Sequence, residues 1–136
     1  MRKLVVGGMC LLLLVGLTSA ATAGGSTSVA GDCLHASVRP GSIVLACADA
    51  NWYVKRLHWR TWGVDRAAGS GVFHFNDCIP NCSAGTFHVR HGRIALSDRR
   101  WCRQARVWVF TRAAIVYDRA WHGHVHLAAG LGCPIS

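Results

Sequence analysis

From residue 42 onward, short apolar or alternating runs are separated by turn residues at a spacing of roughly ten residues, which is typical of an all-β chain. Residues 42–47 are rich in β-branched side chains and are predicted to form a buried strand, which Asp49-Ala50-Asn51 ends as a turn. Residues 52–62 are predicted as the next strand. Its apolar face changes between Val54 and Leu57, so we expect a β-bulge there.

The rest of the chain continues in the same pattern. Residues 72–76 alternate, with Phe73 and Phe75 on one face, and a loop with two cysteines follows over 76–85. Further strands are predicted at 87–96, with Gly92 marking a bulge or a turn, and at 106–117 and 121–127. No long amphipathic helix is indicated. We therefore predict an all-β fold, a small disulfide-stabilised sandwich or barrel of about six or seven strands.

The N-terminus carries the features of a secretion signal. Arg2 and Lys3 precede an apolar run over 4–17, and Ala21-Thr22-Ala23 forms a small-x-small cleavage site. This run is short and interrupted by glycines, so it does not predict a membrane span, and no second stretch reaches spanning length. We expect a signal peptide over 1–23, a flexible leader over 24–31 and a single β domain over 32–136, secreted or otherwise extracytoplasmic.

Cysteine usage agrees with export. Cys10 lies within the signal, which leaves six cysteines that can pair completely: Cys33, Cys47, Cys78, Cys82, Cys102 and Cys133. Six cysteines allow many connectivities, and the residues alone do not select one. The loop pair Cys78 and Cys82 has CxxxC spacing, whereas redox enzymes favour CxxC in a βαβ setting. We therefore expect two structural disulfides that leave this loop in different directions.

The charge of the chain is strongly positive, with fifteen Lys and Arg against six Asp and Glu and a net charge of +9. Without Arg2 and Lys3 the balance is thirteen against six, or +7. Such an excess favours attraction to anionic polymers, either a cell-wall polymer or a nucleic acid, through non-specific electrostatics. The tightest basic group is predicted to bind anions, and it consists of Arg99, Arg100, Arg103 and Arg106. The remaining basic residues are scattered, which weakens the nucleic-acid interpretation.

Aromatic residues are a further candidate for binding. Six tryptophans are many for one small domain. Most are expected in the core because tryptophan buries a large area, and one or two are expected to be exposed.

Three histidines alternate near the C-terminus, at His122, His124 and His126. On a strand they would share one face with neighbours about 6.6 Å apart, so one zinc ion could hold two of them but hardly all three. A third ligand would have to come from another element. The competing interpretation is a solvent-facing strand with Trp121 and Val125 packed inward. No cofactor is implied otherwise.

Two other histidines suggest an enzymatic alternative. His58 and His74 could act as the acid–base pair of a small secreted phosphodiester hydrolase, with a cation from Lys55, Arg60 or Arg66. However, the sequence contains no paired glycosidase carboxylates, nucleophile elbow, phosphate-binding glycine loop or HExxH motif. We therefore favour a non-enzymatic binding or structural module at or outside the cell surface that prefers anionic ligands, and we assign no catalytic residue. Hydrolysis and metal binding remain alternatives.

Residues 40–112 also resemble a group of small exported actinobacterial proteins. The likeness rests on the patterns ACAD-x-N from Ala46, L-x-W-x-x-W from Leu57 and NDC-x-P-x-C from Asn76. The resemblance implies export and a shared β domain, and it brings no biochemical function. It also favours pairing of Cys47 with Cys78 or Cys82 within the shared segment. Cys102 and Cys133 both lie outside the shared pattern, and we expect them to pair with each other. This chain has Ala50 where the group usually has glycine.

Overall fold

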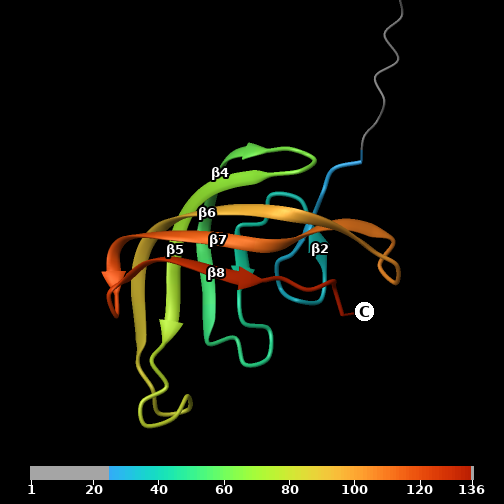
Figure 1. Ribbon diagram of the computed structural model, residues 1–136. Coiled ribbons are helices and arrows are strands. Elements are labelled where there is room, and N and C mark those ends of the chain that lie inside the picture. Colours follow the sequence, from blue (N-terminus) through green and yellow to red (C-terminus); the bar gives the residue numbers. More distant parts are fainter. Residues whose placement is uncertain (1–24, 136) are drawn as a thin grey trace, which may run out of the picture.

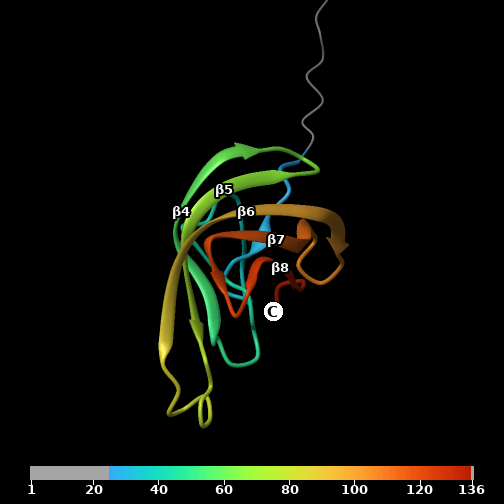
Figure 2. The same ribbon diagram turned by 60° about the vertical axis from the view of Figure 1, so that its left-hand side comes forward.

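The computed structural model describes residues 25–135, so the predicted signal peptide lies outside the described residues. Two short strands, β1 (Val29–Ala30) and β2 (Ala36–Ser37), pair as a hairpin. The other six form one antiparallel sheet in chain order, namely β3 (Ser42–Val44), β4 (Trp52–Trp62), β5 (Ala67–Asn76), β6 (Phe87–Cys102), β7 (Val107–Trp121) and β8 (His124–Gly130). The sheet curls into a half-barrel (Figures 1 and 2), which confirms the all-β prediction. Among the described residues, no helix could span a membrane.

The core lies on the inner face of the curl. Successive strand residues point to opposite faces, so the apolar side chains of each strand gather on the side that the curl encloses. The largest fully buried side chains there are Phe73, Phe110, Ile43, Ile94, Leu96 and Ile115. The outer face has no second sheet or helix over it in the described part of the chain, and it is left to solvent.

Close packing at the bend requires two paired glycines. Gly71 of β5 is the direct partner of Gly92 of β6. A Cβ at Gly71 would lie 2.7 Å from Cγ2 of Val54, and one at Gly92 would lie 2.7 Å from the carbonyl oxygen of Val116. Only glycine tolerates such contacts in a strand. The expectation of a bulge or turn at Gly92 is wrong, because β6 keeps an unbroken register with β5 through this residue.

The predicted bulge in β4 is confirmed. The register with β5 shifts between Lys55 and His58, and Arg56 has a left-handed φ of 52°. As a result, Val54 and Leu57 both reach the core although they are three residues apart. The strand predicted at 42–47 is shorter, because its regular pairing ends at Val44.

The other strands differ from their predicted limits. β5 begins at Ala67, before the predicted residue 72, since its small residues pack where bulky β-formers would not fit. β6 and β7 are both longer than predicted, and they extend together as one hairpin. The strand predicted over 121–127 is divided, because His122 and Gly123 both have positive φ and form the turn between β7 and β8.

The N-terminal segment closes the curl instead of forming a flexible leader. The amide of Ser28 donates to the carbonyl of Trp108 (2.8 Å), and the amide of Phe110 donates to Ser28 (2.9 Å). On the other side, the carbonyl of Gly31 accepts from the amide of Val44 in β3 (2.8 Å). Val29, between these contacts, is fully buried. The expectation of flexibility over 24–31 is therefore wrong for residues 27–30, because this one apolar side chain and its backbone bonds fix the segment inside the curl (Figure 2).

All six cysteines among the described residues are paired, as predicted from their even number. Cys102 pairs with Cys133, which confirms that expectation. The pairing of Cys47 with Cys78 or Cys82 is wrong, because β3 returns along Gly31 and brings Cys47 to Cys33. Cys78 and Cys82 pair with each other, with Cα atoms 3.8 Å apart, because their loop turns back on itself. Three disulfides are typical of proteins that fold in an oxidising compartment.

We expect Val29→Ala to lower the free energy of unfolding by about 2 kcal/mol, because it removes two buried methyl groups and leaves a cavity. Ser26→Ala, at an exposed residue of the same segment, should change it by less than about 0.5 kcal/mol. Urea denaturation of the disulfide-intact protein measures both. Equal stability of the Val29→Ala variant and the parent would contradict the closing role of this segment.

Candidate functional site

The four arginines predicted to bind anions lie on the β6–β7 hairpin, which projects at one end of the molecule (Figure 1). Arg99 and Arg100 belong to β6, whereas Arg103 and Arg106 lie in the turn that leads to β7. Arg100, Arg103 and Arg106 are exposed. Within the described range, none of the four forms an ion pair with a carboxylate. The hairpin therefore presents uncompensated positive charge.

Two tryptophans lie among these arginines. Trp101 and Trp108 are direct partners across the hairpin, with ring centroids 5.5 Å apart. They are the exposed tryptophans, at 44% and 37%, which confirms that one or two would be exposed. The guanidinium of Arg99 lies 4.1 Å from the Trp108 ring centroid, in a cation–π contact. We call the six residues that form this region the hairpin surface, namely Arg99, Arg100, Trp101, Arg103, Arg106 and Trp108.

A second basic region lies on the outer face of the sheet, over β4, β5 and β6. Arg56, His58 and His91 line a shallow hollow of about 270 Å³. An adjoining hollow of about 180 Å³ is lined by His58 with Arg60 and Arg93. No carboxylate is among the residues that line these two hollows.

The register of the sheet explains these hollows. His58 in β4 and Arg93 in β6 are both direct partners of Ser70 in β5. Directly paired residues share a face, so the short Ser70 side chain lies between two long ones and leaves space above it. The sequence pattern predicted roles for His58 and Arg60 but not for Arg56, His91 and Arg93. Only the strand register shows that these five residues lie around the same hollows.

The proposed catalytic histidines are not brought together. His58 and His74 lie four residues apart in the register of β4 and β5, which corresponds to about 13 Å along a strand. His74 instead stacks on Tyr53, with ring centroids 4.8 Å apart. Burial lowers the pKa of His74, and the positive charges of Lys55 and Arg56 lower it further. Arg66, the third candidate cation, lies between β4 and β5. This arrangement gives the hydrolase alternative no support.

The C-terminal histidines are solvent-exposed, as expected, but they do not form one row. His124 and His126 lie in β8, while His122 is in the preceding turn. Within residues 25–135, no group of three or more His, Cys, Asp or Glu side chains is arranged to hold a metal ion. A metal hypothesis for this hairpin would therefore need a ligand from elsewhere.

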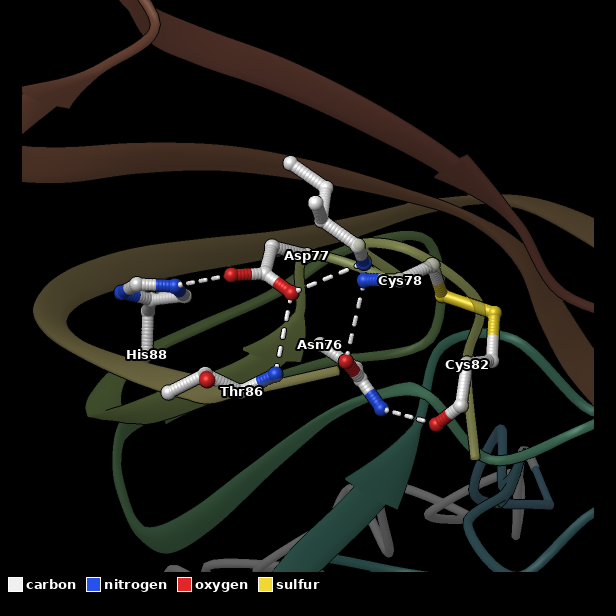
Figure 3. Close-up of polar contacts among 7 residues, drawn as sticks. Asn76, Asp77, Cys78, Cys82, Thr86 and His88 are labelled. Atoms are coloured by element: carbon white, nitrogen blue, oxygen red, sulfur yellow. Dashed lines mark hydrogen bonds and ion pairs between the residues drawn. A yellow bond between two sulfur atoms is a disulfide. The ribbon is translucent and has the colours of Figure 1, made fainter. Parts of the chain in front are cut away.

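The loop between β5 and β6, which contains the NDC-x-P-x-C pattern, is held by its own polar side chains (Figure 3). The Asn76 side chain accepts from the amide of Cys78 (3.0 Å) and donates to the carbonyl of Cys82 (2.7 Å). Asp77 Oδ1 accepts from the amides of Ile79 (3.1 Å) and Thr86 (2.9 Å). These contacts and the disulfide give the pattern a structural explanation.

The second oxygen of the Asp77 carboxylate lies 2.9 Å from Nε2 of His88 in β6. This contact, followed by the two amide donors, lowers the pKa of Asp77 to about 2. The carboxylate therefore stays ionised at any ordinary pH, where it fastens the loop to the start of β6. Both oxygens of the Asp77 carboxylate are bonded within the protein, so we assign this residue a structural role.

Comparisons with protein families, with curated proteins and with solved structures find no match to this chain. The two basic regions are therefore the features of the molecule from which a function can be inferred.

We expect Asp77→Asn to destabilise the protein above about pH 4 but not at about pH 2. A carboxylate whose folded pKa is depressed stabilises the fold above its unfolded pKa and loses this effect as the pH falls through the folded value. Urea denaturation curves of the parent and the variant should thus converge as the pH is lowered. Asp65→Asn is the control, since within the described structure its carboxylate has no hydrogen-bond or ion-pair partner. A constant gap between parent and Asp77→Asn down to pH 2 would contradict this role.

Proposed function

We propose that the protein is an exported, non-enzymatic module that binds an anionic polymer, a cell-wall polymer or a nucleic acid, at or outside the cell surface. The observation that carries this proposal is the hairpin surface, where two exposed tryptophans lie on the same hairpin as four arginines without carboxylate partners in the described structure. The disulfides and the signal-like N-terminus support an extracytoplasmic location.

The chemistry of the hairpin surface suits a polymer with phosphate, sulfate or carboxylate groups. Guanidinium groups bind such anions through paired donors, and their contact with a polyanion releases counterions, which makes binding salt-dependent. Exposed indoles add stacking or apolar contact with rings of the ligand. A polymer without negative charge would gain little by leaving water for this surface, because four of its six residues are arginines.

The hairpin is also held in place before any ligand arrives. At the pair that closes its turn, Cys102 is almost completely buried and is bonded to Cys133. On the β7 side, Ser28 is hydrogen-bonded to the backbone of both Trp108 and Phe110. Anchoring of this kind lowers the conformational entropy lost on binding, because less of the surface must be ordered by the ligand.

We expect the triple variant Arg100→Gln, Arg103→Gln, Arg106→Gln to elute from immobilised heparin at clearly lower salt than the parent. The slope of log K against log salt should become less steep by about one unit for each phosphate- or sulfate-like contact that is lost. The matched control is Arg39→Gln, Arg66→Gln, Arg119→Gln, which removes the same charge from exposed residues elsewhere. The control should elute close to the parent.

Equal losses in the two triple variants would mean that binding depends on net charge alone, which would contradict a defined site on the hairpin. A Trp101→Ala variant refines the test. It should weaken binding without changing the salt dependence, because it removes ring contact and leaves the charges in place.

A further inference from the structure

The two hollows on the outer face form one elongated recess across β5. They share His58 and Ser70, which lie at the boundary where the two hollows adjoin. Side chains reach the recess from both sides, from β4 and from β6. We call the five charged or titratable residues around it the outer-face site, namely Arg56, His58, Arg60, His91 and Arg93.

Positive charge dominates the surroundings of this site. Within the described structure, none of its three arginines forms an ion pair. Lys55 in β4 and His91 in β6 are both partners of Val72, which brings a further cation beside the recess. Asp118 of β7 lines a neighbouring hollow together with Arg93. An anion in the recess would therefore meet several cationic side chains, and no carboxylate lines either of the two hollows.

We infer that the outer-face site is a second binding site, specific for phosphate groups and independent of the function proposed for the hairpin surface. A phosphate group offers more acceptor oxygens than a carboxylate and carries up to two negative charges. Arg56 lines one hollow and Arg93 lines the other, so each hollow offers a guanidinium to a phosphate group, and Ser70 is common to both. Two joined hollows fit two consecutive phosphate groups, as in pyrophosphate or in neighbouring units of a phosphodiester polymer.

The test is titration calorimetry of inorganic pyrophosphate into the full disulfide-bonded protein. At about pH 5.5, the double variant Arg56→Gln, Arg93→Gln should bind at least about tenfold more weakly, as expected for loss of charged hydrogen bonds. The matched control Arg39→Gln, Arg119→Gln, at two exposed arginines outside both basic regions, should bind like the parent. The double variant His58→Gln, His91→Gln should also bind more weakly than the parent, because both imidazoles line the recess.

Further arms identify the source of the phosphate. Binding of pyrophosphate alone indicates a small ligand, whereas stronger binding of an oligo(glycerol phosphate) indicates a polymer, and both outcomes support the site. The inference is overturned if neither probe binds, if succinate binds as tightly as pyrophosphate, or if the Arg39 and Arg119 control loses as much affinity as the Arg56 and Arg93 variant. Heparin retention tests the hairpin surface separately, so failure of one site is distinguishable from failure of the other.

Discussion

The backbone contacts of residues 27–31 are the constraint on which the rest of this fold depends. A six-stranded antiparallel sheet that curls without closing leaves its inner face open along one side. Here Ser28 is bonded to β7 and Gly31 to β3, so one short segment connects the two sides of the opening. Val29 fills the space between them. Two tryptophans reinforce the closure, since the indole of Trp62 donates to Thr27 and that of Trp59 donates to Pro40.

This closure also decides where binding can occur. Because the apolar side chains are enclosed on the inner face, the outer face carries no packing requirement and can hold long cationic side chains. The bend at Gly71 and Gly92 brings β4, β5 and β6 together closely enough for His58 and Arg93 to flank one serine. The β6–β7 hairpin extends beyond the curl (Figure 1), and Arg100, Arg103, Arg106 and its two tryptophans are exposed. Both basic regions thus follow from a single-layer sheet.

Alternation and turn chemistry were sufficient to predict the strand class, the limits of β4 and its bulge. They failed where small residues dominate. Residues 67–71 lack bulky side chains, and their place in β5 depends on close approach to β4, which is a tertiary effect. The segment around Val29 has the composition of a linker, and one buried valine decides its structure. Disulfide partners and the pairing of His58 with Ser70 depend on register, which residue patterns do not fix.

The tryptophan indole N–H signals in a nuclear magnetic resonance spectrum test the central claim, that anionic polymers bind at the hairpin surface. The indoles of Trp52, Trp59 and Trp62 donate to acceptors inside the molecule. Those of Trp101 and Trp108 have no acceptor within the part of the chain that the structure describes, and their rings are exposed. On addition of heparin, the account predicts that the Trp101 and Trp108 signals shift while the other three stay. Shifts of the three internal indoles with no change at Trp101 and Trp108 would contradict it.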